Sequence, residues 1–225
     1  MGQEIDIGYF NKDVVRKISR GFRAIGPQMI AFDLGKEYYD GERGNGYGGF
    51  GYDGRWQRLL PPLIERYGLT EHSSVLDLGC KKGFIMHDFK QLLPGITVKG
   101  VENHPYPIET SMEDIRDDIL LWRYDQLPFE DNAFDFVIAF SAIYMENLRG
   151  VIGALREIQR VSNGNSFVTL GAYRTLEGRD KFLEWTLLGT SILHVDEWHE
   201  VFEYTGYTGD YYFTTAESLN LEWAD

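Results

Sequence analysis

Asp77, Gly79, Gly83 and Glu102 are the residues of this 225-residue chain whose types and spacing suggest ligand chemistry. Asp77 lies near the end of a short apolar run, which is followed by a glycine-containing turn and then by a helical pattern. Glycines at such a turn let a ligand approach the backbone, whose N–H groups we expect to point outward. An acidic side chain at the end of the next strand, roughly 20 residues later, can accept hydrogen bonds from ribose hydroxyls. The pattern predicts a site for a nucleoside-containing ligand, although a similar turn also occurs in other doubly wound proteins.

The elements that position these residues are alternating strands and helices. The first helix is predicted from an apolar stripe of Val14, Val15, Ile18 and Phe22. Hydrophobic periodicity, glycines and prolines delimit the others. We expect strands over residues 75–78, 97–101, 119–122, 136–140, 166–172 and 211–214, and helices over 11–25, 56–67, 84–93, 105–118, 147–161, 176–188 and 196–204.

Two sequence motifs together indicate a family. Residues 75–83 read Val-Leu-Asp-Leu-Gly-Cys-Lys-Lys-Gly, and residues 127–135 read Leu-Pro-Phe-Glu-Asp-Asn-Ala-Phe-Asp. The first run resembles the glycine motif of class I S-adenosylmethionine (SAM) methyltransferases, except that Lys81 replaces a glycine. The second run is similar to the Leu-Pro-Phe-x-Asp-x-x-Phe-Asp signature of the same family. The resemblance covers residues 75–212, and a dehydrogenase would instead carry Gly-x-Gly-x-x-Gly at the turn.

The resemblance implies an α/β fold with a Rossmann-like, seven-stranded, mostly parallel sheet, helices on both faces and an antiparallel pair at the end. Residues 1–58 would form an N-terminal helix and a lid or cap, and residues 59–225 the SAM-binding domain. The implied cofactor is SAM, and the residues we expect to bind it are Asp77, Gly79, Cys80, Lys81, Gly83, Glu102, Asn103, Tyr124 and Asp125.

Residues 35–56 combine eight glycines with six aromatic residues. Glycines allow turns and backbone motion, and aromatic rings supply flat surfaces, so the segment is typical of a lid that closes over a ligand. We expect Tyr47, Tyr52 and Arg55 to contact the substrate. The alternative is a surface loop that its aromatic residues anchor to the core.

Tyr144 and Arg174 are the candidate catalytic residues. Tyr144 follows the predicted strand at 136–140 and occupies a position where the family often has histidine. With a pKa of about 10, a tyrosine is a weaker base than histidine at neutral pH. Arg174 follows the strand at 166–172, whose end we expect at the ligand crevice. The alternatives are a core aromatic residue for Tyr144 and a surface ion pair for Arg174.

The resemblance implies methyl transfer from SAM to an oxygen or nitrogen of a small molecule. A weaker association suggests a sugar- or phosphate-containing precursor of a surface polysaccharide or secondary metabolite. Lys81 in the glycine motif keeps two alternatives open. One is a non-catalytic regulatory or partner subunit with the SAM-binding fold, and the other is a nucleotide-sugar-modifying enzyme with a different cofactor.

Composition limits the partners. A net charge of −13 repels phosphate backbones, so we expect no nucleic-acid substrate. One cysteine permits no internal disulfide, and we see neither a signal-peptide pattern nor an apolar run of about 18 residues. We therefore expect a cytoplasmic protein that binds a small-molecule acceptor and does not bind a membrane. For its assembly we consider a homodimer. The histidines lack ligand spacing, so we expect no metal site.

Overall fold

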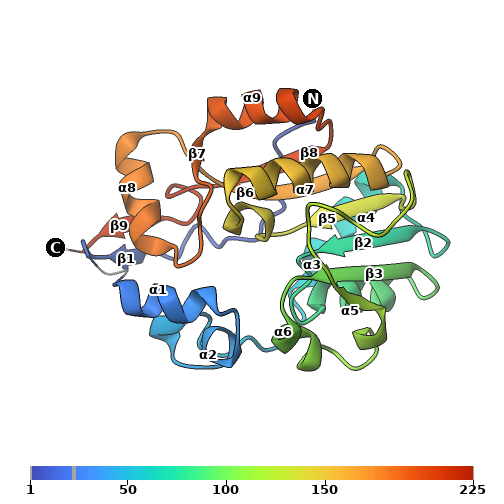
Figure 1. Cartoon of the computed structure of the whole chain (residues 1–225), viewed down its shortest axis with the longest axis horizontal. Helices are drawn as coiled ribbons and strands as arrows, with labels where there is room; N and C mark the ends of the chain where they lie inside the picture. Colours follow the sequence, from blue (N-terminus) through green and yellow to red (C-terminus); the bar gives the residue numbers. More distant parts are fainter. Residues whose placement is uncertain (1, 22–23, 225) are drawn as a thin grey trace.

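The computed structural model describes residues 2–21 and 24–224 and is organised around a seven-stranded parallel sheet (Figure 1). The strands in this sheet follow the order β4-β3-β2-β5-β6-β7, and β8 also pairs with β6. Every strand pair in the sheet is parallel. The strands of the chain are β1 (Arg16–Ile18), β2 (Ser74–Leu78), β3 (Thr97–Glu102), β4 (Ile119–Leu121), β5 (Phe136–Ala139), β6 (Ser166–Tyr173), β7 (Leu193–His194), β8 (Asp210–Thr214) and β9 (Leu221–Trp223).

Helices cover both faces of the sheet (Figure 1). They are α1 (Ile25–Phe32), α2 (Lys36–Tyr39), α3 (Trp56–Leu59), α4 (Pro61–Tyr67), α5 (Phe84–Leu92), α6 (Pro105–Glu109), α7 (Leu148–Val161), α8 (Leu176–Trp185) and α9 (Val195–Thr205), with 3-10 turns η1 (Arg43–Asn45), η2 (Arg116–Asp118) and η3 (Ile143–Met145). Within residues 2–21 and 24–224, none of these helices has the length and apolar character needed to cross a membrane.

The two faces of β2 illustrate why two cores form. Successive side chains of a strand point to opposite faces. Leu76 and Leu78 therefore join the core beneath α7 and α9, whereas Val75 joins the core beneath α3, α4 and α5. In the first core, the indole Nε1 of the fully buried Trp198 donates to the carbonyl of Gly171 on β6 at 3.0 Å. Strand β2 is thus packed against a hydrophobic core on each face of the sheet.

Most predicted elements are confirmed with small changes at their ends. The helix expected over residues 56–67 is divided at Pro61 into α3 and α4, because a proline is tolerated only in a first turn. The helix expected over residues 105–118 is restricted to α6 and the short η2. The predicted strands and the remaining helices occur within a few residues of their expected bounds.

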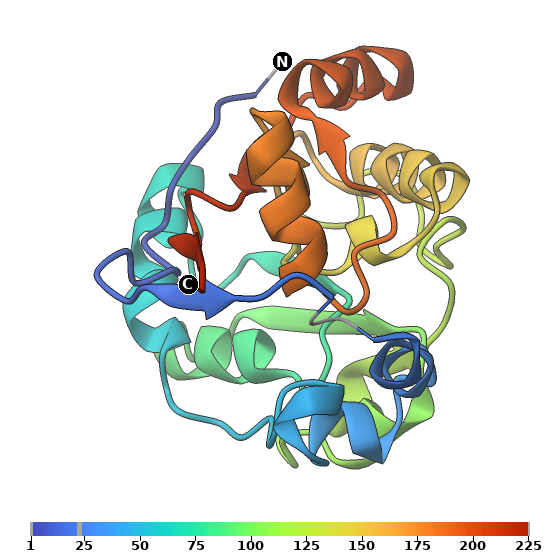
Figure 2. The ribbon, with the colours of Figure 1, turned by 90° about the vertical axis from the view of Figure 1, so that its left-hand side faces the viewer.

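The helix predicted over residues 11–25 is wrong. Residues 16–18 instead form β1, which pairs in parallel with β9 near the other end of the chain (Figure 2). The guanidinium of Arg16 donates to the carbonyl of Leu219 at 2.7 Å, and Ile18 is buried against Phe182 of α8. A local periodicity cannot report a partner strand 205 residues away in the sequence, and here that pairing overrides the helical pattern. Phe22 lies outside the described residues.

The antiparallel pair expected at the end of the sheet is also wrong. β8 runs parallel to β6, with Phe167 opposite Asp210 and Gly171 opposite Thr214. The connection through α8, β7 and α9 returns the chain to the edge of the sheet where β6 begins, so β8 must run in the same direction. The exposed edge of β8 is met by the N-terminal segment, in which the amide of Ile5 donates to the carbonyl of Tyr211 at 2.8 Å.

Candidate functional site

Two adjoining cavities lie at the carboxyl ends of β2 and β5, where parallel sheets commonly bind ligands. We call the first, of about 240 Å³, the aromatic cavity and the second, of about 170 Å³, the carboxylate cavity. The aromatic cavity includes Tyr9, Phe10, Tyr47, Phe50, Trp56 and Tyr144; the carboxylate cavity includes Leu34, Tyr39, Glu102, Asn103, Tyr124 and Glu146. The residues that line both, which we call the junction, are Tyr38, Gly79, Lys81, Ser141, Met145 and Leu188.

The turn after β2 requires its two predicted glycines. Gly79 has a φ of 76°, and a Cβ atom there would lie 2.2 Å from the Cβ of Ala142. Gly83 has a φ of 75°, and its added Cβ would lie 2.1 Å from the Cδ1 of Ile115. Both the backbone conformation and the available space therefore exclude a side chain. These glycines bring β2, α5 and the loop after β5 close together and so form the floor of the site.

The expectation that the N–H groups of this turn point outward is wrong for three of them. The amides of Gly79 and Cys80 donate to the carbonyl of Val101, at 2.8 and 3.3 Å. The amide of Lys81 donates to the Glu102 carboxylate at 2.8 Å. The end of β3 lies beside the turn and takes these donors. These three amides are therefore not available to a ligand, which the side chains that line the cavities must recognise instead.

Glu102 is a buried, partly satisfied acceptor at the end of β3. It is 2% exposed, and besides the Lys81 amide it accepts bonds from the Asn103 amide at 2.9 Å and the Tyr124 hydroxyl at 3.1 Å. A carboxylate offers about four acceptor positions, so one remains for a ligand hydroxyl. Burial raises the pKa of Glu102, and the charge of Lys81 partly offsets that rise.

Asp77 is buried without a hydrogen-bond donor. The residue is 1% exposed, and neither carboxylate oxygen has a partner among the described residues. Burial raises its pKa to about 7, an effect that the positive charge of Lys81 reduces and the negative charge of Glu102 reinforces. An unpartnered buried carboxyl group is costly, and such groups concentrate at functional sites.

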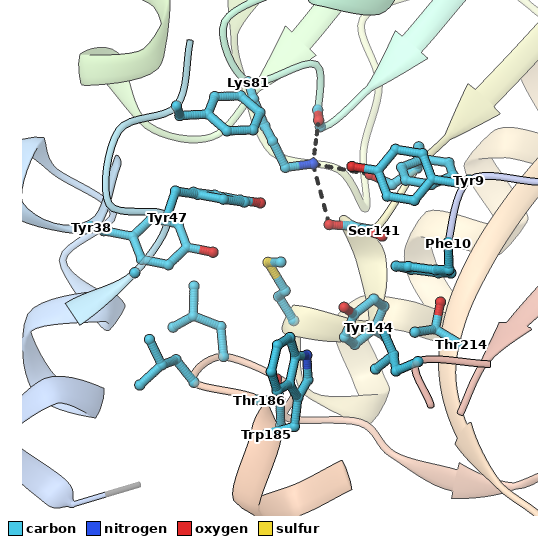
Figure 3. A pocket seen from close by; sticks show the side chains of 18 of the residues that line it. Tyr9, Phe10, Tyr38, Tyr47, Lys81, Ser141, Tyr144, Trp185, Thr186 and Thr214 are labelled. Carbon is cyan, nitrogen blue, oxygen red and sulfur yellow. Dashed lines mark hydrogen bonds between the residues drawn. The ribbon is translucent and has the colours of Figure 1, made fainter. Parts of the chain in front are cut away.

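The aromatic cavity is built from segments that are far apart in the sequence (Figure 3). Tyr9 comes from the N-terminal segment, Tyr47 from the segment at 35–56, Tyr144 from η3 and Trp185 from the end of α8. Burial raises the pKa of Tyr144 above its ordinary value, so its phenol remains protonated at neutral pH. Tyr144 can therefore hydrogen-bond to a ligand but is a poor proton acceptor.

Asp40 fastens the segment at 35–56 over these cavities. Its carboxylate accepts two bonds from the Lys82 ammonium, at 2.7 and 2.8 Å, and one from the Tyr106 hydroxyl at 2.7 Å. The amide of Phe50 also donates to it at 3.1 Å. Desolvation would raise the pKa of Asp40, but these donors, led by Lys82, hold it below its ordinary value. The segment is thereby tied to both the glycine turn and α6.

Arg174 and Tyr52, predicted to act on the substrate, lie outside both cavities. The Arg174 guanidinium pairs with the Glu4 carboxylate at 2.8 Å, because the N-terminal segment runs along β8 beside it. The Tyr52 hydroxyl donates to the buried Asp88 carboxylate on α5. In this arrangement Arg174 forms the surface ion pair that was its alternative interpretation, and Tyr52 attaches the segment at 35–56 to α5.

Arg55 and Asp125 are also engaged with neighbours. The guanidinium of Arg55 pairs with Asp53, two residues earlier in the chain. Asp125 pairs with Arg123 in a surface groove next to the carboxylate cavity. Neither residue lines the two cavities, and their roles in ligand binding stay predictions.

The remaining predicted residues converge on the site. Gly79, Lys81 and Glu102 line the carboxylate cavity with Asn103 and Tyr124, while Cys80, Tyr47 and Tyr144 line the aromatic cavity. Sequence reasoning missed a second group contributed by distant segments: Tyr9, Phe10, Trp185 and Thr214. The adjacent aromatic pair Tyr9-Phe10 was a local signal for part of this group.

Among residues 2–21 and 24–224, no group of three or more His, Cys, Asp or Glu side chains is arranged to hold a metal ion.

Comparison with known proteins identifies the central part of the chain. The family model described as a methyltransferase domain matches residues 76–169. Similar folds include the YcgJ protein from Bacillus subtilis, with 19% identity, a TM-score of 0.54 and coverage of 65% of this chain and 66% of that chain. A chain from a complex between the Haloferax volcanii Trm112 methyltransferase activator and a putative methyltransferase is 20% identical. Its TM-score is 0.55, and the match covers 86% of this chain and 77% of that chain. A putative methyltransferase from Bacillus halodurans is 16% identical, with a TM-score of 0.51 and coverage of 65% of this chain and 68% of that chain. A search of curated protein sequences gave no match.

Proposed function

We propose that the chain is a class I, SAM-dependent methyltransferase that transfers a methyl group to an oxygen or nitrogen of a small molecule held in the aromatic cavity; the match of residues 76–169 to a methyltransferase-domain model supports this. The observation that carries the proposal is the junction. There the carboxylate cavity, which Glu102 lines, adjoins the aromatic cavity, whose volume of about 240 Å³ suits a small acceptor. Bound SAM supplies a methyl group on a positively charged sulfur, which is already a good leaving group.

The residues of the carboxylate cavity fit this cofactor. The remaining acceptor position of Glu102 suits a ribose hydroxyl, and Asn103 lies next to it in the lining. Tyr39 and Leu34 supply apolar walls for a flat base. The unpartnered carboxyl group of Asp77 lies at the end of β2, where a ligand donor or an ordered water would satisfy it. Residues at one end of the cavity therefore bind the adenosyl part, and those at the junction bind the other end.

The aromatic cavity favours a ring-bearing acceptor. Its lining is dominated by aromatic rings, which pack against flat or apolar surfaces. The two cationic side chains in its described lining, Arg43 and Lys81, both donate to backbone carbonyls instead of standing free. An aromatic compound or the apolar face of a sugar ring fits this lining better than a phosphate group. The net charge of −13 also favours a small acceptor over nucleic acid, and we place the reaction in the cytoplasm.

The protein's own contribution to the reaction is alignment and exclusion of water. The junction residues hold the two reacting groups next to one another, and alignment alone can supply much of the rate enhancement. The phenol of Tyr144 orients the acceptor by hydrogen bonding. We propose that residues 1–58 act as the lid, with the Asp40 anchor keeping the segment at 35–56 closed over the cavities.

A second candidate is a partner subunit that has the SAM-binding fold and no catalysis. Lys81 favours it, because its side chain occupies the junction where a catalytic member of the family has a glycine. Such a subunit would bind neither SAM nor S-adenosylhomocysteine, and replacing Lys81 with glycine would restore binding because it removes the side chain from the junction.

Calorimetric titration with SAM and with S-adenosylhomocysteine tests the proposal. We expect both to bind, and Glu102→Ala to weaken binding at least about tenfold because a charged acceptor is lost. Glu130→Ala removes an exposed carboxylate and serves as the control. If the wild-type protein binds neither compound, the partner-subunit function replaces the catalytic one, and binding gained by Lys81→Gly would identify the lysine side chain as the cause. Where binding occurs, labelled SAM with a panel of ring-bearing hydroxyl and amine compounds identifies the acceptor class.

A further inference from the structure

The ammonium group of Lys81 lies on a cluster of backbone carbonyls at the junction. Its Nζ donates to the carbonyls of Phe140 at 3.0 Å, Ser141 at 3.3 Å and Gly79 at 3.4 Å (Figure 3). These carbonyls come from the ends of two adjacent parallel strands, β2 and β5. Three oxygens directed at one point form a seat for a cationic N–H donor, and in this protein a side chain of the chain itself fills it.

The backbone at this seat adopts an unusual conformation. Lys81 has a φ of 54° and Ser141 a φ of 49°, a region that non-glycine residues seldom occupy. Residues in such conformations persist only when their surroundings hold them, and they cluster at functional sites. A glycine at position 81 would adopt this conformation without strain. A lysine at position 81 is therefore conformationally unfavourable relative to glycine. The three hydrogen bonds of its ammonium show what the side chain contributes in return.

Lys81, Gly79 and Ser141 line both cavities, whereas Glu102 lines the carboxylate cavity alone. With the ribose at Glu102, the amino-acid end of the cofactor extends toward the junction and therefore toward this seat. The amino-acid end of SAM carries both an ammonium and a carboxylate. An ammonium placed here would have to compete with Lys81 for the carbonyls and would be repelled by its charge, whereas a carboxylate would be attracted.

We propose that Lys81 is a specificity-determining residue whose ammonium replaces the amino group of the ligand on these carbonyls, so that the protein recognises the amino-acid end of its cofactor by the carboxylate and not by the amine. This inference rests on the proposed function, because it assumes that the ligand is a SAM-like nucleoside. It assigns to position 81 a role in binding rather than a defect in the glycine motif.

The test compares three ligands by calorimetry: S-adenosylhomocysteine, its deaminated analogue 4-(adenosylthio)butanoate, and its decarboxylated analogue adenosyl 3-aminopropyl sulfide. For the wild-type protein we expect removal of the amine to change the Kd less than about threefold, and removal of the carboxylate to weaken binding at least about tenfold. For Lys81→Gly, which frees the carbonyls, we expect the reverse order. Lys81→Met keeps the seat filled without charge and should lose the carboxylate preference without gaining an amine preference.

Lys99→Met removes an ammonium that pairs with Asp118 on another part of the sheet and should retain the wild-type order of ligands. The proposal is overturned if the wild-type protein needs the amine as strongly as Lys81→Gly does, because Lys81 then leaves the seat when the ligand binds. The same order of affinities in all variants would also overturn it, while leaving the proposed function intact. Failure of every variant to bind every ligand would instead reject both the proposed function and this inference.

Discussion

The buried carboxyl group of Asp77 should make the stability of this protein fall as pH rises, and Asp77→Asn should remove that dependence. In the folded protein burial raises the pKa of Asp77 to about 7, from an ordinary value of 3.8. Between these two values the folded state holds a proton that the unfolded chain has released. Stability therefore decreases with rising pH across this window and levels off above about pH 7.

The magnitude follows from the two pKa values. Their difference, at 1.36 kcal/mol for each pH unit, corresponds to about 4 kcal/mol of lost stability above pH 7. Because the carboxyl group is 1% exposed and has no donor among the described residues, solvent does little to reduce this cost. Over the range from about pH 4.5 to about pH 7.5, the expected change is about 3 kcal/mol.

The assay is urea unfolding of both proteins at intervals across that pH range. The free energy of unfolding of the wild-type protein should fall by about 3 kcal/mol relative to Asp77→Asn as the pH rises. Asp117→Asn removes an exposed aspartate and should follow the wild-type protein at every pH. A difference between wild type and Asp77→Asn that stays constant within about 1 kcal/mol, or that grows in the opposite direction, would refute the reasoning.

Two further predictions concern the lid and the core. Lys82→Met should lower the free energy of unfolding by about 2 kcal/mol and speed hydrogen exchange at the Phe50 amide, because the Asp40 carboxylate loses its ammonium partner. Hydrogen exchange measured by mass spectrometry checks the second effect. Unchanged protection of the segment at 35–56 would mean that the Asp40 anchor does not hold this segment. Trp198→Ala should lower the free energy of unfolding by about 3–5 kcal/mol, because the substitution opens a cavity in a fully buried core and leaves the Gly171 carbonyl without its donor. Denaturant unfolding measures this loss, and a loss below about 1 kcal/mol would contradict the close packing of Trp198.

The sequence alone was sufficient for the central part of the fold. Strand β2, the glycine turn and helix α5 follow from an apolar run, two glycines and a local helical pattern. The position of Glu102 at the end of the next strand follows from the same local spacing. These features depend on residues close together in the chain, so their physical causes can be read from composition and order.

Other features required the tertiary structure. The pairing of β1 with β9 and the parallel direction of β8 depend on partners that no local periodicity encodes. Lys81 likewise departs from a glycine motif in the sequence. Whether its ammonium excludes a ligand, binds it or makes no contact with it depends on the carbonyl of Phe140, 59 residues away. Local patterns determine the elements in the central part of the chain, whereas long-range packing determines the strand at residues 16–18 and which side chains and carbonyls meet at the site.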